Sequence, residues 1–159
     1  MTPAPIDLAA ALQLLPHGPE FRFLDRVLRL TPGKEAVAEY RVRGDEPFLR
    51  GHFPGQPLMP GVLLIEAGAQ LAGIVAQTDP ETGPLADLKL TAVRAAKITG
   101  SARPGETIEI AARVTGRLGP LIQGEVEVTL TGRPLLKATL ALSGVSAGLR
   151  DAITRNRPG

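Results

Sequence analysis

The chain has 159 residues, of which 43% are hydrophobic and 3% aromatic, and its formal net charge is +2. This length is enough for one ordinary domain, whose core must be built mainly from aliphatic side chains. The absence of cysteine excludes disulfides, a cysteine nucleophile and thiolate zinc sites, and the small, dispersed positive charge does not favour a nucleic-acid surface.

A short helix and two strands are predicted near the start of the chain. Asp7 can cap a helix over residues 8–15, and Pro16 ends it. Apolar positions within residues 21–30 favour a strand, and the alternation of apolar and polar residues over 35–43 predicts a second strand.

A loop rich in glycine and proline, residues 50–60, precedes a long apolar segment. Proline fixes backbone angles and glycine permits unusual ones, so this composition predicts a loop of defined shape. Pro60 suits the first turn of a helix, and residues 61–77 are apolar on nearly every side. These features predict a helix that is buried on most of its surface.

The rest of the chain is predicted to form strands over residues 89–98, 108–114, 122–130 and 136–142, with one turn at 116–120. Consecutive strands with short turns indicate an antiparallel sheet with one wet face. A sheet and a single buried helix can each cover the other's apolar surface. We therefore predict an α+β hot-dog fold, with a curved antiparallel sheet around a long central helix, in one domain over residues 1–147 and a tail over 148–159.

Several classes of ligand and location are not expected. The chain lacks the glycine patterns that bind dinucleotides or phosphates, and it has two histidines and no HExxH pattern. It also lacks a secretory signal and any uninterrupted apolar run of about 18–20 residues. We expect no cofactor, no metal site, no membrane insertion and a cytoplasmic location.

Two ionisable side chains indicate a candidate site. Glu66 is the only ionisable residue between positions 62 and 78, and burying an isolated charge is costly, so this carboxyl must be desolvated, paired or functional. His52 lies in the rigid loop just upstream and is a natural partner. Together they suggest proton transfer, although a paired core carboxylate and a loop histidine bonded to a carbonyl are alternatives.

One segment resembles a known enzyme family. Residues 51–67, GHFPGQPLMPGVLLIEA, resemble the signature of 3-hydroxyacyl-acyl-carrier-protein dehydratases of the FabZ type. The runs LLPH at 14–17, LDRV at 24–27 and EPF at 46–48 resemble that family in order and spacing. The similarity extends over roughly residues 12–145, which is most of the chain.

This resemblance implies an activity and an assembly. The family dehydrates 3-hydroxyacyl thioesters on acyl carrier protein to trans-2-enoyl thioesters in fatty acid biosynthesis. Its catalytic histidine and acidic residue fall on His52 and Glu66, and in the family they come from different subunits. The resemblance therefore implies a lyase that forms a homodimer or a trimer of dimers, with an acyl carrier protein as partner and the acyl group on its phosphopantetheine.

The residues suggest how such a site would work. A histidine titrates near neutral pH and suits the base, and a carboxyl among apolar residues suits the acid. The helix N-terminus at Gly61 and Val62 can stabilise the negative charge on a thioester oxygen. It stays open whether His52 serves as both base and acid, with Glu66 orienting it or a water molecule.

Further positions complete the predicted site. Phe53 and Gly55 in the loop are assigned to substrate binding, although Gly55 could serve only the turn. Gln70, one helical turn after Glu66, could position that carboxyl or make an ordinary buried hydrogen bond. The cations proposed to meet the carrier protein, or else to form a solvated face, are Arg94, Lys97 and Arg103.

Two departures from the family pattern concern the substrate path. The segment Gly18-Pro19-Glu20 follows His17 where the family usually has Arg-Tyr-Pro, and we interpret His17 as a structural, capping or surface residue. Gly68 replaces a larger residue and could widen the acyl tunnel. Two alternative functions stay open: a hot-dog acyl thioesterase, in which the carboxylate activates water, and a non-catalytic acyl-binding or scaffold subunit, which the altered entrance segment leaves possible.

Overall fold

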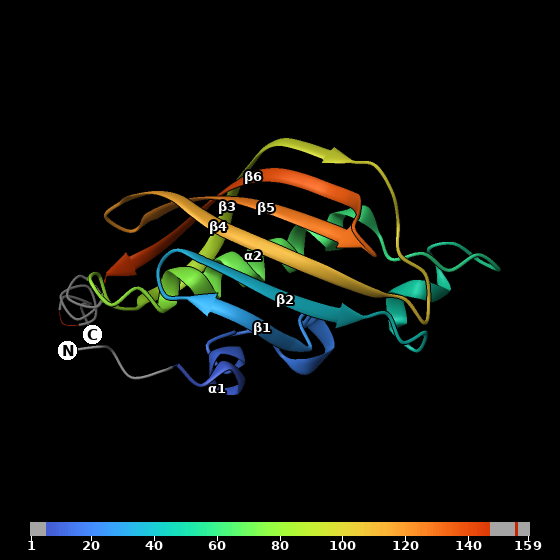
Figure 1. Ribbon diagram of the computed structural model, residues 1–159, viewed down its shortest axis with the longest axis horizontal. Coiled ribbons are helices and arrows are strands. Elements are labelled where there is room, and N and C mark those ends of the chain that lie inside the picture. Colours follow the sequence, from blue (N-terminus) through green and yellow to red (C-terminus); the bar gives the residue numbers. More distant parts are fainter. Residues whose placement is uncertain (1–5, 147–154, 156–159) are drawn as a thin grey trace.

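A single long helix, α2, lies inside a curved sheet in the computed structural model, which describes residues 6–146 and 155 (Figure 1). α2 spans Gly61–Gln77, the bounds that the apolar run predicts, and most of its side chains from Leu64 onward are buried. A helix that is apolar on nearly every side is stable only when other elements surround it. The arrangement confirms the predicted hot-dog fold.

Within the described residues the sheet has six strands: β1 Arg26–Thr31, β2 Glu35–Arg41, β3 Leu85–Ile98, β4 Thr107–Leu118, β5 Leu121–Leu130 and β6 Arg133–Ser146. Their spatial order is β1-β2-β4-β5-β6-β3, and each neighbouring pair is antiparallel. β1 and β3 therefore form the two edges of the sheet.

Small residues let α2 approach the sheet closely. A Cβ atom at Gly68 would lie 2.8 Å from the Cβ of Val126 on β5, so only glycine fits at this contact. Gly68 therefore faces the sheet, and the expectation that it widens an acyl tunnel is wrong. The inner face of the sheet follows the predicted alternation, with Ile108 and Ile110 of β4 fully buried on either side of the exposed Glu109.

The predicted strand over residues 21–30 is only partly correct. Pro19–Phe21 form a 3-10 turn, η1, and β1 begins at Arg26. The side-chain amide of Gln70 on α2 accepts a hydrogen bond from the Phe23 N–H at 2.9 Å and donates one to the Phe21 carbonyl at 2.8 Å. A helix side chain thus takes the place of a neighbouring strand for this segment.

Other boundaries differ from the prediction by a few residues. α1 is shorter than predicted, Leu8–Leu12, and Asp7 caps it as expected. β4 continues through the predicted turn to Leu118, because a bulge between Val114 and Gly116 keeps it paired with β5. The predicted tail lies outside the described residues apart from Arg155, so the boundary at 147 stays a prediction. No helix in the described ranges is long and apolar enough to span a membrane.

Candidate active site

The buried carboxylate of Glu46 anchors the backbone just before the glycine- and proline-rich loop. Glu46 precedes a 3-10 turn, η2, Pro47–Arg50, and accepts hydrogen bonds from the Tyr40 hydroxyl and from the Arg43 and Gly44 N–H groups at 2.7–2.8 Å. Burial raises the pKa of the Glu46 carboxyl, but these hydrogen bonds outweigh burial and lower the pKa below its ordinary value. The ionised carboxylate fixes the chain where it turns toward His52.

His52 is held by its own loop. Its Nδ1 lies 2.9 Å from the Leu58 carbonyl, and the Leu58 N–H donates to the His52 carbonyl at 2.7 Å. A carbonyl can only accept, so Nδ1 carries the hydrogen and the neutral ring keeps a lone pair on Nε2. The ring stacks on Phe53, with centroids 4.2 Å apart. This arrangement leaves Nε2 available as a proton acceptor.

The first turn of α2 follows the loop and has no side-chain cap. A Cβ atom at Gly61 would lie 2.8 Å from Cδ1 of Ile98, so a larger residue here would displace the end of that side chain. Val62 is 68% exposed. The first N–H groups of a helix have no partner within the helix, so Gly61 and Val62 present donors and a partial positive charge. Gly55 has a φ of +76°, a left-handed backbone angle that favours glycine, so the shape of the turn alone accounts for glycine at this position.

Glu66 contacts the other histidine, His17, rather than His52. The Nε2 atom of His17 lies 3.2 Å from Oε1 of Glu66, and Gln70 donates to the same oxygen at 3.1 Å. Nδ1 of His17 is buried without a hydrogen-bond partner. A buried N–H without an acceptor costs more than an unused lone pair, so the hydrogen lies on Nε2 and points to Glu66. His17 was interpreted from the sequence as structural, and its place beside Glu66 was missed.

Gln70 is fixed from three directions. Besides Glu66, its amide binds the Phe21 carbonyl and the Phe23 N–H, and the residue is 2% exposed. Both donors, His17 and Gln70, bond to Oε1 of Glu66, so its Oε2 has no hydrogen bond from either of them. That oxygen is the one on which a transferable proton can reside.

A cavity of about 450 Å³ opens beside this carboxyl. One face of α2 from Glu66 to Gln77 forms one wall, and residues Leu14 to His17 form the second. Leucines of β3 and β6, among them Leu88, and the charged Asp87 and Lys89 of β3 complete the lining. We call this space the Glu66 cavity. It is mainly apolar around a few polar groups, as is typical of ligand sites.

Within one chain the predicted catalytic pair is not brought together. Glu66 pairs with His17, whereas His52 contacts Leu58 and Phe53. Phe53 is 53% exposed and Ile98, beside Gly61, is 48% exposed, so the His52 end of the molecule presents apolar side chains to the outside. Among the described residues, no three His, Cys, Asp or Glu side chains form a group that could hold a metal ion.

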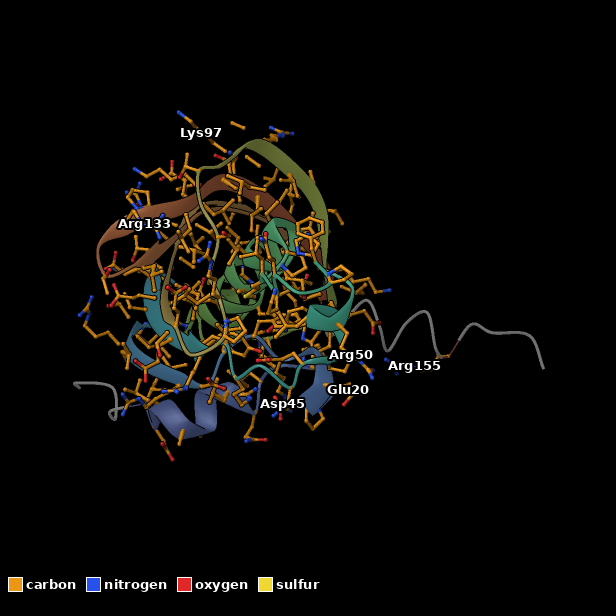
Figure 2. All side chains as sticks on the ribbon, turned by 90° about the vertical axis from the view of Figure 1, so that its right-hand side faces the viewer. Glu20, Asp45, Arg50, Lys97, Arg133 and Arg155 are labelled. Carbon is orange, nitrogen blue, oxygen red and sulfur yellow. The ribbon has the colours of Figure 1, made fainter. Side chains whose placement is uncertain are left out.

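The predicted carrier-binding cations lie on the surface. Arg94 and Lys97 are exposed on β3, and Arg103 is exposed in the segment that follows. Arg133, which the sequence interpretation missed, lies near Gly100 and on the same side as Lys97 (Figure 2). Glu20 and Asp45 lie on the opposite side in this view.

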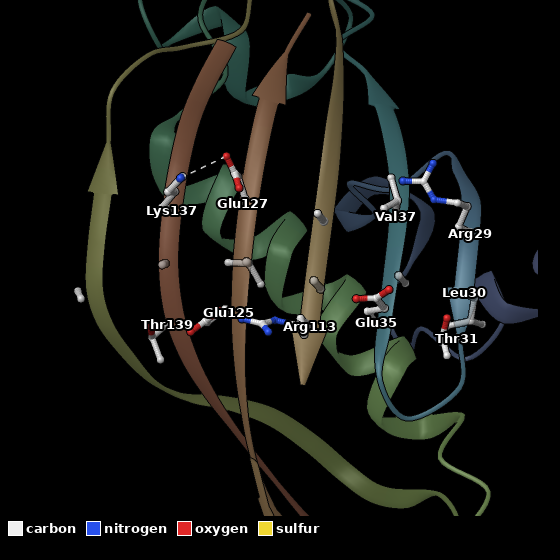
Figure 3. Close-up of a pocket in the computed structure, with 16 residues that line it drawn as sticks. Arg29, Leu30, Thr31, Glu35, Val37, Arg113, Glu125, Glu127, Lys137 and Thr139 are labelled. Atoms are coloured by element: carbon white, nitrogen blue, oxygen red, sulfur yellow. Dashed lines mark hydrogen bonds and ion pairs between the residues drawn. The ribbon is translucent and has the colours of Figure 1, made fainter. Parts of the chain in front are cut away.

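A second hollow of about 590 Å³ lies on the face of the sheet opposite α2 (Figure 3). It contains no residue of the predicted catalytic site, and four of its charged side chains form two ion pairs. Arg113 lies 2.6 Å from Glu125, and Lys137 lies 3.7 Å from Glu127. This hollow is a solvated sheet face rather than a second candidate centre.

Comparison with known proteins places the chain in a family. The model of the FabA-like domain matches residues 15–138. The chain is 36% identical over 151 residues to "3-hydroxyacyl-[acyl-carrier-protein] dehydratase FabZ" of Syntrophobacter fumaroxidans, a match that covers 92% of this chain and all of the relative. It is 39% identical over 116 residues to the FabZ protein of Anaeromyxobacter sp. (strain K), covering 72% of this chain and 74% of the relative.

Two solved structures share the fold. One is the dehydratase heterocomplex ApeI:P from Xenorhabdus doucetiae, with a TM-score of 0.73, 21% identity and coverage of 92% of this chain and 97% of that chain. The other is zebra fish thioesterase superfamily member 2, with a TM-score of 0.67, 16% identity and coverage of 87% and 99%. At these identities the likeness establishes the fold alone.

Proposed function

The chain belongs to the family of FabA-like domains, and from this premise we infer that it is a 3-hydroxyacyl-[acyl-carrier-protein] dehydratase of the FabZ type. It removes water from 3-hydroxyacyl thioesters to give trans-2-enoyl thioesters in fatty acid biosynthesis. The observation that carries this conclusion is the match to dehydratases along most of the chain. A cytoplasmic location is part of the proposal.

The proposed chemistry uses two residues and one helix end. Nε2 of His52 removes the proton from C2, and negative charge develops on the thioester oxygen near the N–H groups of Gly61 and Val62. The electrons then form the C2–C3 double bond. The hydroxyl leaves C3 as water with the proton from Oε2 of Glu66. Phe53, stacked on the imidazole, shields this exchange from solvent.

Two copies of the chain are needed for this reaction. The lone pair of His52 and the free oxygen of Glu66 belong to separate regions of one protomer. β3 is an edge strand with no partner on its outer side within the described chain, and Val93 and Ile98 on it are exposed. Pairing of two copies along such an edge would cover apolar surface. We propose a homodimer in which each site combines His52 of one copy with Glu66 of the other, with further assembly into hexamers open.

The surface cations complete the proposal. Arg94, Lys97 and Arg103, with Arg133 added, give a positive surface beside β3. Complementary charge speeds encounter with an acidic partner and sets its orientation. We propose that this surface receives the acyl carrier protein that bears the 3-hydroxyacyl phosphopantetheine.

Hydration of a crotonyl thioester, the reverse reaction, tests the proposed function. We expect loss of the enoyl absorbance with no release of free thiol. Release of thiol without hydration would instead indicate a thioesterase, the alternative that the fold also permits. If the enoyl absorbance stays constant and no thiol is released, the protein is an acyl-binding or scaffold subunit.

Replacing His17 separates a positioning role from a packing role. We expect His17→Leu to lower kcat by roughly 10- to 100-fold, the effect of losing a hydrogen bond to a charged group, with little change in KM. His17→Gln keeps an N–H donor near the position of Nε2 and should restore kcat to within about threefold. Steady-state kinetics on both variants checks this, and equal losses in the two would show that His17 acts through its shape.

A further inference from the structure

The side of α2 that faces the Glu66 cavity carries a repeated set of polar or small residues. Glu66, Gln70, Gly73 and Gln77 are spaced by three or four positions, so they lie along one face of the helix, and all four line the cavity. Glu66 and Gln70 are explained by the proposed chemistry. Gln77 lies about 16 Å along the helix from Glu66, given a rise of about 1.5 Å per residue.

Gln77 bridges the far end of the cavity to the sheet. Its Nε2 donates to the Leu85 carbonyl at 2.7 Å, and its Oε1 accepts from the Leu85 N–H at 2.7 Å. Leu85 is the first residue of β3 and is buried. Both ends of the amide are therefore occupied, and moving the side chain would leave two partly buried backbone groups without partners.

We propose that this Gln77–Leu85 bridge is the floor of an acyl pocket and sets the longest acyl chain that the enzyme accepts. The proposal rests on the proposed function, because the reacting carbons must lie at Glu66. An extended hydrocarbon with bonds of about 1.5 Å advances about 1.25 Å per carbon, so about thirteen carbons beyond C3 span the distance to Gln77, which corresponds to a substrate of about sixteen carbons. The methyl end of a longer chain would have to displace the Gln77–Leu85 bridge, and a methyl group cannot replace its two hydrogen bonds.

Gly73 keeps the path to that floor open. The nearest atom to a Cβ built at this position is Cδ2 of Leu88, at 3.8 Å, so a Cβ would fit here in ordinary van der Waals contact and glycine leaves that room in the cavity wall unfilled. Glycine lowers helix propensity relative to alanine, and no close approach of backbone requires it here. A branched side chain at 73 would narrow the cavity about 10 Å from Glu66, about eight carbons beyond C3 or roughly the eleventh carbon of a substrate.

A panel of substrates of different chain length, measured on the wild-type and variant enzymes, tests whether the Gln77–Leu85 bridge limits the length of the acyl chain. Hydration of trans-2-enoyl thioesters of about four to twenty carbons is measured as kcat/KM, with each methylene that enters the pocket worth on the order of fourfold. The wild type should lose activity beyond about sixteen carbons. Gln77→Ala should raise kcat/KM at about eighteen carbons by roughly fifteenfold, because two more methylenes enter. Gly73→Val should lower it about tenfold at about twelve to sixteen carbons and leave four-carbon substrates unaffected.

The outcomes distinguish failure of the proposed limit on chain length from failure of the proposed function. Gln123→Ala, which removes an exposed glutamine on the outer face of β5, is the matched control and should keep the wild-type length profile. The Gly73→Val result keeps the test valid if Gln77→Ala unfolds. The proposed limit on chain length would be overturned if kcat/KM of the wild type did not depend on chain length. It would also be overturned if a folded Gln77→Ala or Gly73→Val variant kept the wild-type dependence. Lack of hydration at every length would overturn the proposed function.

Discussion

Replacing His52 with alanine is expected to lower kcat/KM for hydration of a trans-2-enoyl thioester by about 100- to 10,000-fold, the usual contribution of a general acid–base group. The Leu58 carbonyl fixes the hydrogen on Nδ1, which leaves Nε2 as the acceptor. Alanine removes that lone pair and the ring that stacks on Phe53. Absorbance of the enoyl thioester measures the loss.

The matched control for His52 is its exposed neighbour Arg50, in the last position of η2. Arg50→Ala should keep activity within about threefold, because surface substitutions away from buried features have small effects. Near-normal hydration by a folded His52→Ala enzyme would refute the assignment of His52. A loss in both variants would instead point to disturbance of the loop.

The fold could be predicted because its strongest patterns are periodic. The apolar run from Gly61 to Gln77 predicts the central helix to the residue, since a helix that is apolar all round must be buried. Alternation in β2, β4, β5 and β6 likewise gives the inner face of the sheet. The segment from Phe21 to Phe23 could not be assigned correctly, because its hydrogen-bond partner is a side chain 47 positions away.

The site was harder to predict than the fold. Gln70 was weighed as a residue that could position Glu66, and it does contact that carboxyl. His17 was missed because a histidine after a helix-ending proline has no local pattern that indicates function. Its presence in the run LLPH, which resembles the family, was the available signal. Its contact with Glu66 depends on how residues 13–18 cross α2, and tertiary packing alone decides that.

The second large effect is expected for Glu66→Gln, with hydration lowered by about 100- to 10,000-fold. Glutamine keeps the size of the side chain, and its carbonyl can still accept from His17 and Gln70. The amide nitrogen replaces Oε2 and carries no transferable proton, so the change removes proton transfer and leaves the packing intact. The same enoyl-thioester assay measures it. A loss below about tenfold would favour the alternative in which His52 acts as both base and acid and Glu66 only orients it.

Mixing the two inactive variants then tests where each residue comes from. If His52 and Glu66 of one site belong to different copies, a dimer of one His52→Ala chain and one Glu66→Gln chain contains one intact site and one doubly altered site. Random exchange of subunits makes half of the dimers mixed, so activity should recover to about a quarter of the wild-type value. Each variant unfolded and refolded alone is the control and should stay inactive. If the mixture also stays inactive while subunit exchange is verified, each site lies within one chain, and the proposed shared site is refuted.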